Sequence, residues 1–286
     1  VLERENELAR VKKEVDWDGE AGAISRKTFE HEGPDLLFEK IKDYPEGYRI
    51  SNGTSGTWGR VALSMMLPKN TPVRKIYREY EERIDIKIPP KIVKKADAPC
   101  KENIMLGEKV DLNEFPAPMV HEGDGGRYIG TWDVVVNKEP ETNWTNWGMY
   151  RFMVHTKNWL TGWPQSTSQL AFIMKKSYLP YNKPMPIAVV LGTDPLSHIV
   201  ATAGIKTFED EVDHVGGLRG EPVELVKCET SDLLVPAHAE IIIEGELMPD
   251  QIAPDGPFGE YPGYRSGTMC AGVAVKVKAI TYRSKP

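Results

Sequence analysis

The sequence has few cysteines and lacks the short motifs that assign a metalloprotease or a serine hydrolase. Its three cysteines, Cys100, Cys228 and Cys270, are odd in number and scattered along the chain. This spacing argues against a disulfide framework or a zinc site and is typical of reduced, structural thiols. The six histidines form no HExxH pair, and no GxSxG elbow is present. These absences exclude a disulfide-stabilised secreted domain, a metalloprotease of the HExxH type and a serine hydrolase of the GxSxG type.

Long apolar runs and basic clusters are also missing. No apolar run approaches the roughly 20 residues that a membrane-spanning helix needs, and the first residues do not resemble a secretory signal. The net charge is −6 without a basic block or stripe, which argues against nucleic-acid binding. We therefore expect a cytoplasmic protein without a nucleic-acid or membrane partner.

The chain is nevertheless long enough to bury a sizeable core, with 286 residues of which 40% are hydrophobic. We expect two domains, residues 1–100 and 101–286, because proline breakers gather in residues 91–118. The chain starts at Val1 without a methionine and stops at Pro286, just after a strand-like run. We therefore expect that it is cut from a longer chain.

In the first half, the pattern predicts a buried strand over residues 36–41 and a helix over residues 61–67. Residues 74–90 are highly charged and predict a solvated helix. The side of this helix that we expect to be buried carries Ile76, Tyr77, Tyr80 and Ile84.

The second half is dominated by strand patterns. The predicted strands are residues 128–136, 146–154, 186–191, 239–247 and 272–282. Residues 169–176 predict one helix, and residues 207–212 predict part of another. Many strands with turn signals and few helices indicate a barrel-like sheet.

One stretch, residues 143–151, combines aromatic faces, amide groups and a single guanidinium, that of Arg151. A guanidinium presents a planar fork that matches a carboxylate or a phosphate, so Arg151 is a candidate anion clamp. Taken alone, an arginine on a strand is more often the partner of a surface carboxylate.

Two acids, Asp255 and Glu260, flank the segment Gly-Pro-Phe-Gly. Glycine and proline around two acids indicate a constrained loop with close backbone approach. Acid/base chemistry and a solvated turn are equally good interpretations of this loop. Asn146 and Glu211 carry oxygen ligands that suit magnesium or manganese more than zinc, but their distance in sequence makes this weak evidence alone.

Four groups of residues, in order along the chain, carry a resemblance to a known family. They are Gly33–Glu39 with Tyr44-Pro45 and Asn52-Gly53; Asn146–Arg151; Glu211 with Gly216–Gly220; and Val235–Glu240 with Glu244-Gly245 and Gly256–Glu260. The chain resembles, over nearly its whole length, the UbiD family of reversible (de)carboxylases, which use prenylated FMN. The resemblance implies an α+β fold: an N-terminal α/β domain, then a split β-barrel flavin-binding domain, with the family's C-terminal domain missing.

The resemblance also implies a set of site residues. Arg151, Asp255 and Glu260 match the family's catalytic arginine and two acids, although the family often has glutamate at the position of Asp255. The matched cofactor-binding positions are Asn146, Trp147, Met149, Tyr150, Arg151, Ser168, Gln169 and Glu211. Asn146, Gln169 and Glu211 match the ligands of Mn²⁺ or Mg²⁺, with Gln169 where the family commonly has histidine. The Trp147 carbonyl matches a K⁺ ligand.

The function implied is non-oxidative, reversible decarboxylation of an aromatic or α,β-unsaturated acid, with Glu260 as proton donor. We favour a hydroxybenzoic acid as substrate, a flavin prenyltransferase as the source of cofactor, and a homo-oligomer. Two alternatives stay open: an ordinary FMN-dependent oxidoreductase, and a non-catalytic subunit of a carboxylase complex.

Overall fold

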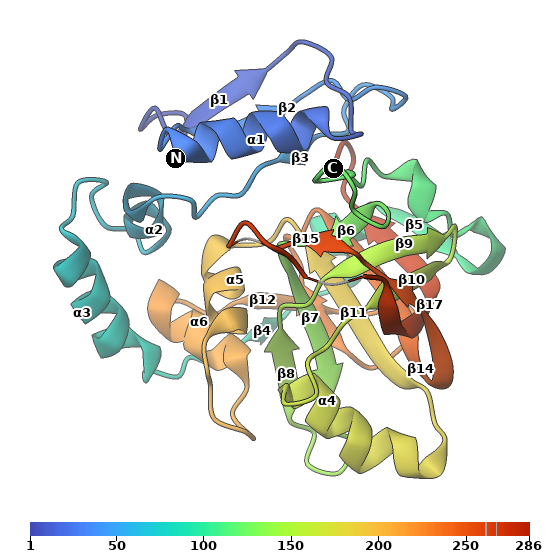
Figure 1. Cartoon of the computed structure of the whole chain (residues 1–286). Helices are drawn as coiled ribbons and strands as arrows, with labels where there is room; N and C mark the ends of the chain where they lie inside the picture. Colours follow the sequence, from blue (N-terminus) through green and yellow to red (C-terminus); the bar gives the residue numbers. More distant parts are fainter. Residues whose placement is uncertain (261, 267) are drawn as a thin grey trace.

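The computed structural model describes the whole chain except residues 261 and 267. Figure 1 shows a small N-terminal unit above a larger curved sheet that has helices on its sides. The fold is mixed α+β, which confirms the predicted class.

The N-terminal unit is a three-stranded sheet with one helix packed on it. Its elements are β1 (Leu8–Val11), α1 (Glu20–Glu30), β2 (Asp35–Phe38) and β3 (Ile50–Ser51). β2 lies in the middle, parallel to β1 and antiparallel to β3, and its Leu36 and Phe38 pack in the core of this unit. The strand predicted over residues 36–41 is therefore confirmed in its first part. The sequence does not predict α1, because only Ala21 of its 11 residues is buried.

Two helices, α2 (Trp58–Ser64) and α3 (Val73–Ile84), lead from this unit to the large sheet. The helix predicted over residues 74–90 is confirmed as far as Ile84, and the last six residues of that range lie outside it. Tyr77 is 61% exposed, so its predicted burial is wrong. Ile76, Tyr80 and Ile84 follow one another at every fourth position and form a single buried stripe. Tyr77 is one residue, about 100° round the helix, away from Ile76.

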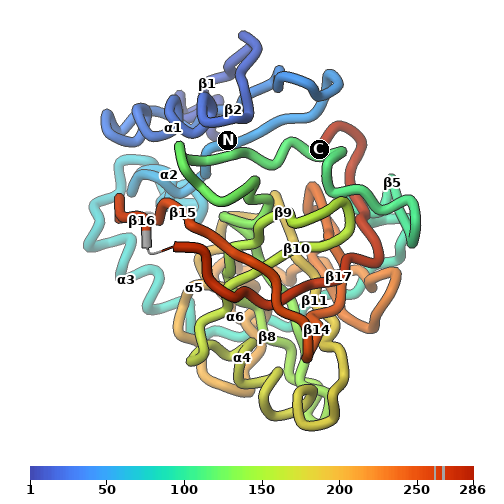
Figure 2. The backbone as a smooth tube through the Cα atoms, turned by 45° about the vertical axis from the view of Figure 1, so that its right-hand side comes forward, coloured from blue at the N-terminus to red at the C-terminus, as the bar shows by residue number. Residues whose placement is uncertain are grey.

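The large sheet is antiparallel throughout and has nine strands in the described part of the chain. Its strands are β5 (Asn103–Leu106), β6 (Tyr128–Gly130), β7 (Asp133–Lys138), β8 (Thr145–Gly148), β9 (Phe152–Thr156), β10 (Trp159–Gly162), β11 (Met185–Leu191), β14 (Ile241–Asp255) and β17 (Cys270–Tyr282). They follow the order β6-β9-β10-β17-β14-β11-β7-β8, with β5 beside β17. Figure 2 shows how the strands curve round the core, which confirms a barrel-like sheet.

Two predicted strands are each divided in two, and the division has one cause. β6 and β8 are the two edge strands of the sheet. β7 follows β6 in the chain but pairs with β8 at the opposite edge, and β9 follows β8 but pairs with β6. The links at residues 131–132 and 149–151 must therefore both cross the opening of the split barrel. The Asp133 carboxylate joins them, because its Oδ1 accepts the Tyr150 N–H at 3.2 Å.

Three helices cover this sheet near β8: α4 (Gln169–Ile173), α5 (Pro195–Thr202) and α6 (Glu211–Arg219). α4 continues as one π-helical turn to Tyr178, so the helix predicted over residues 169–176 is confirmed. In α6, a Cβ added at Gly217 would lie 1.8 Å from the Ile86 carbonyl oxygen. Glycine at this position therefore allows α6 to approach the segment after α3 closely.

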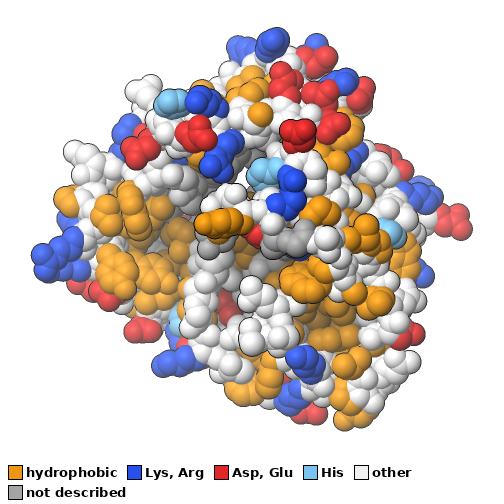
Figure 3. Space-filling model, viewed as in Figure 1, with side chains coloured by type: hydrophobic (Ala, Val, Ile, Leu, Met, Phe, Trp, Pro, Cys, Tyr) orange, Lys and Arg blue, Asp and Glu red, His pale blue; other side chains and the backbone are white. Residues whose placement is uncertain are grey.

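The remaining strands are short. β4 (Lys91–Ile92), β12 (Glu224–Lys227) and β13 (Leu234–Pro236) form a second three-stranded sheet, and β15 (Phe258–Gly259) pairs with β16 (Arg265–Ser266). Among the described residues, no helix has the length and apolar character needed to cross a membrane. Figure 3 shows hydrophobic side chains gathered over the side that carries α2 and α3, where Trp58 and Met66 are exposed.

Candidate active site

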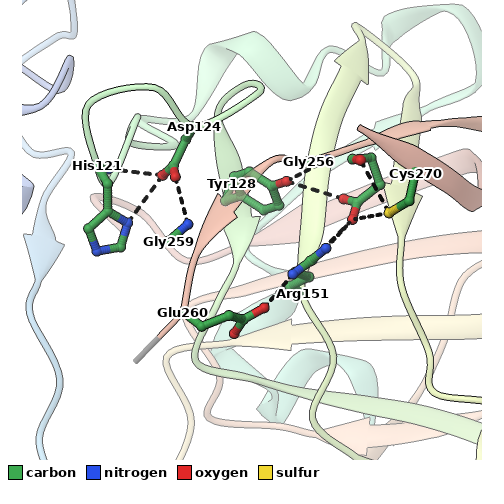
Figure 4. A network of polar contacts seen from close by, with 9 residues as sticks. His121, Asp124, Tyr128, Arg151, Gly256, Gly259, Glu260 and Cys270 are labelled. Atoms are coloured by element: carbon green, nitrogen blue, oxygen red, sulfur yellow. Dashed lines mark hydrogen bonds and ion pairs between the residues drawn. The ribbon is translucent and has the colours of Figure 1, made fainter. Parts of the chain in front are cut away.

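Arg151 contacts both Asp255 and Glu260, and Figure 4 shows the Arg151 side chain beside Glu260. The Arg151 Nε and Nη2 donate to Asp255 Oδ2 at 3.0 and 2.6 Å, and Nη1 donates to Glu260 Oε1. Arg151 lies on the link between β8 and β9, Asp255 ends β14, and Glu260 follows β15. The arginine therefore bridges two acids that are 104 and 109 residues away in the sequence.

The two acids differ in their access to solvent. The Asp255 side chain is 0% exposed and that of Glu260 is 35% exposed, with Arg151 between them at 15%. Burial acts to lower the pKa of Arg151, but the hydrogen bonds and charge of Asp255 outweigh it, so the pKa is raised. Arg151 thus stays charged and holds one enclosed and one accessible carboxylate.

The loop that carries the acids is fixed by residues from the segment before β6. The Asp124 carboxylate accepts the Gly259 N–H at 2.8 Å and the His121 N–H at 2.9 Å. The His121 ring packs edge-on against Phe258, with 5.8 Å between ring centroids. Phe258 in turn lies under the Arg151 guanidinium, 5.5 Å from its centre.

A second polar group forms where β8 meets the first residues of α4 and α6. Glu211 is 1% exposed and its Oε2 accepts the Trp147 N–H at 2.8 Å. Burial raises the pKa of Glu211 to about 8, and this N–H opposes the shift. Asn146, one residue earlier, is also buried, and its Nδ2 has no hydrogen-bond partner among the described residues.

Tyr150, on the link after β8, adds a buried phenol to this region. Burial raises the pKa of Tyr150, and the polar groups of Ser168, Leu170 and Asn146 oppose the shift. Ser168 also caps α4, because its Oγ accepts the Ala171 N–H at 3.2 Å. The Gln169 Nε2 donates to the Ile205 carbonyl at 2.9 Å.

This second group has the donor set of a hard cation. Within the described ranges, no cluster of three His, Cys, Asp or Glu residues could hold a metal ion. Asn146, Gln169 and Glu211 instead offer two amides and one buried carboxylate. Oxygen donors of this kind suit Mg²⁺ or Mn²⁺, and a bound cation would favour the charged form of Glu211. The donor types of these three residues are those that such a cation takes, and the metal site itself stays a prediction.

The other predicted cofactor-binding residues have different surroundings. The Trp147 side chain is buried in the hydrophobic core with Val134 and Val136, so only its backbone is available to a ligand. Met149 is half-buried in the link before Arg151.

An open pocket of about 490 Å³ lies beside β17. It is lined by residues 162–167, which lead to Ser168, and by Ala271 and Val273 of β17. Ala271 is next to Cys270, the residue paired with Asp255 across the β14–β17 ladder. This volume is in the range of small-molecule sites.

Several residues of the site are not predicted from the sequence. Tyr128, Asp124 and Asp133 contact the acid loop or the Arg151 link through their polar atoms. Asn137 is fully buried opposite Asn146, and neither of its amide atoms has a partner in the described part of the chain. Tyr128 and Asp133 lie inside the strand predicted over residues 128–136, where a polar group does not specify its partner. Asp124 and Asn137 lie outside the predicted strands.

Two family models match this chain. Residues 91–286 match the family described as UbiD, 3-octaprenyl-4-hydroxybenzoate carboxy-lyase Rift-related domain. Residues 1–80 match its 3-octaprenyl-4-hydroxybenzoate carboxy-lyase N-terminal domain. The domain boundary near residue 100 stays a prediction.

Relatives and solved structures extend the match to the full chain. The pyrrole-2-carboxylic acid decarboxylase of Pseudomonas aeruginosa is 36% identical over 100% of this chain and 58% of its own length. The vanillic acid decarboxylase of Sedimentibacter hydroxybenzoicus, in closed form, is 35% identical with a TM-score of 0.95, over 100% of this chain and 61% of that chain. The UbiD-class enzyme HmfF of Pelotomaculum thermopropionicum, in complex with prFMN, is 30% identical with a TM-score of 0.90, over 100% and 64%.

The chain thus spans about 60% of the length of these relatives. Both family matches occur in order, and together they cover nearly all of the residues described above. The chain belongs to the UbiD family.

Proposed function

We propose that this chain carries the catalytic site of a reversible, non-oxidative decarboxylase of aromatic or α,β-unsaturated acids that uses prenylated FMN. The observation that carries the proposal is one arginine in contact with two acids of unequal exposure. The relatives named above are decarboxylases of aromatic acids, and one of the UbiD-class structures contains prFMN, which supports the same reaction class.

Arg151 would orient the substrate. A guanidinium has five N–H donors, and three of them are used for Asp255 and Glu260. The two that remain can bind the carboxylate of an incoming acid, whose negative charge complements the arginine. Asp255 holds the other edge of the guanidinium and so sets the direction in which these donors point.

Glu260 would transfer the proton. Its carboxyl is accessible enough to reach a bound molecule, whereas Asp255 is enclosed and cannot. After CO2 leaves, Glu260 protonates the carbon that carried it, and in carboxylation Glu260 removes that proton. Arg151 keeps the Glu260 carboxyl beside the substrate in both directions.

Loss of CO2 leaves an electron pair that no protein side chain can accept, and prenylated FMN supplies the electron sink when it is bound. Asn146, Gln169 and Glu211 would hold Mn²⁺ or Mg²⁺, and the Trp147 carbonyl would bind K⁺. Met149, Tyr150, Arg151 and Ser168 would contact the flavin. A flavin prenyltransferase would supply the cofactor to a cytoplasmic homo-oligomer.

Hydroxybenzoic acids are the substrates that we favour. The pocket is bordered by Trp163, so flat apolar surface is available on one side of it. Aromatic side chains of this kind stack on a planar ring.

The experiment is production of the protein together with a flavin prenyltransferase, followed by mass spectrometry of the released cofactor and a CO2-release assay on a panel of acids. The proposal predicts the mass of prenylated FMN and CO2 release from at least one aromatic acid. Ordinary FMN with NAD(P)H consumption would identify an oxidoreductase instead. Absence of both flavin and CO2 release would favour a non-catalytic subunit.

A further inference from the structure

Tyr128 contacts the enclosed acid directly. Its side chain is fully buried in β6, and its hydroxyl donates to Asp255 Oδ1 at 3.2 Å and accepts the Gly256 N–H at 3.0 Å. Burial, with the charge of Asp255, raises the pKa of Tyr128 far above its usual range, so the hydroxyl keeps its proton. One hydroxyl thus holds both the Asp255 side chain and the backbone that follows it (Figure 4).

The two oxygens of Asp255 have separate partners. Oδ1 faces Tyr128, and Oδ2 accepts from Nε and Nη2 of Arg151. The carboxylate therefore cannot rotate without losing one partner. Because Asp255 occupies Nε and Nη2, the remaining nitrogen, Nη1, is directed to Glu260.

The residues before Tyr128 hold the rest of the acid loop in the same way. The Gly125 N–H donates to the Pro257 carbonyl at 2.7 Å, and the Gly259 N–H donates to Asp124 at 2.8 Å. A Cβ at Gly125 would lie 1.9 Å from the Gly256 carbonyl oxygen, so the two backbones are in direct contact. Residues 124–128 thus lie alongside residues 255–259, the loop that carries the acids, and contact it along this length.

We propose that Tyr128 is a positioning residue, which holds Asp255 so that Arg151 directs Glu260 towards the substrate. The proposal rests on the proposed function. Without the hydroxyl, Asp255 Oδ1 is buried with no oxygen or nitrogen donor, and the carboxylate turns towards Arg151 and competes with Glu260 for its N–H groups. The expected loss is in turnover and not in substrate binding, because Tyr128 has no exposed surface to offer a ligand.

The test is Tyr128→Phe in the protein loaded with prenylated FMN. We expect kcat to fall by roughly 10- to 100-fold, while KM and the flavin content change by less than about twofold. The matched control is Tyr178→Phe, which removes a hydroxyl that donates to the Lys138 carbonyl outside this network. A kcat equal to that of the wild type in Tyr128→Phe would overturn the proposal.

A readout that needs no activity separates this proposal from the proposed function. The Arg151 Nε–H is hydrogen-bonded to Asp255, so its exchange with water, followed by ¹⁵N NMR in flavin-free protein, should be faster in Tyr128→Phe and unchanged in Tyr178→Phe. Faster exchange in a protein that decarboxylates no acid would support the positioning role and remove the proposed function. Unchanged exchange in Tyr128→Phe, together with decarboxylation by the wild type, would remove the positioning role and support the proposed function.

If Tyr128→Phe does not fold, 3-fluorotyrosine at position 128 keeps the ring and provides a more acidic, stronger donor. Slower exchange of the Arg151 Nε–H is then expected. Exchange at the wild-type rate would contradict the proposal.

Discussion

Asp255 and Glu260 carry the same functional group but have different surroundings. Asp255 is closed off by Arg151 and Tyr128, and Glu260 shares only one edge of the guanidinium. An enclosed carboxylate that is fully hydrogen-bonded is suited to holding a neighbour in place, and an accessible one is suited to proton transfer. The division of roles between the two acids therefore follows from burial and contacts, and the acid loop does not reveal it in the sequence.

We predict that the proposed cation binding at Glu211 depends on pH. Its pKa is about 8 without a cation, and a cation requires the carboxylate. The affinity for Mn²⁺ should therefore rise with pH and level off above about 8, with release of one proton per cation at lower pH. Titration calorimetry in buffers of different ionisation enthalpy measures both quantities.

Two variants separate Glu211 from general charge effects on Mn²⁺ binding. Glu211→Gln should weaken binding and remove its pH dependence. Glu224→Gln should change neither, because the partners of Glu224 lower its pKa to about 2 and it is already charged in this range. An unaltered Mn²⁺ titration in Glu211→Gln would contradict the cation assignment.

At the scale of elements, the two links across the opening of the split barrel place the site. Arg151 lies on one of them, and Asp133 at the end of the other accepts the Tyr150 N–H. Residues 131–132 and 149–151 interrupt strand-like sequence, so local pattern alone predicts one continuous strand where the barrel needs two. The site is built at this interruption because a link, unlike a paired strand, leaves its polar side chains free to reach other elements.

Asp133 should make stability fall with pH. Burial raises its pKa well above the ordinary value of 3.8, so above that pH the unfolded chain is ionised while the folded one still holds the proton. Stability contributed at low pH is then lost as pH rises. Asp133→Asn keeps an acceptor for the Tyr150 N–H, so its free energy of unfolding should exceed that of the wild type by a margin that grows from pH 4 to 8.

Urea unfolding at several pH values measures this margin. Asp133→Ala is the companion variant, and it should be destabilised by about 1–3 kcal/mol because the Tyr150 N–H loses its acceptor. A difference between Asp133→Asn and the wild type that stays constant with pH would show that Asp133 is ionised in the folded protein.

The contact of α6 with the segment after α3 should depend on Gly217. Gly217→Ala places a methyl group against the Ile86 carbonyl and should lower the free energy of unfolding by about 1–3 kcal/mol. Gly204→Ala is the control, because a Cβ there has no described atom within 4 Å, and its effect should be below about 1 kcal/mol. Equal stability of the two variants in chemical denaturation would contradict the close approach.

In the molecule as a whole, the sequence predicts the helices and strands better than the contacts between them. β11 is a nearly continuous apolar run and the buried stripe of α3 has helical spacing, so both are predicted from local pattern. Arg151 and Asp255 are 104 residues apart, and no local pattern predicts that contact. That contact is expected only from the resemblance to a family. The roles of Tyr128 and Asp133 cannot be predicted in either way, because their hydrogen-bond partners are known only from the folded sheet.

We propose above that Arg151 and two unequally exposed acids form a decarboxylation site in which Glu260 delivers the proton. The most direct measurement is turnover of an aromatic acid by prenylated-FMN-loaded protein in D2O, for the wild type and for Glu260→Gln. We predict product deuterated at the carbon that lost CO2, and a turnover about 10²- to 10⁴-fold lower in Glu260→Gln. Wild-type turnover in Glu260→Gln, with the same deuterated product, would contradict the account.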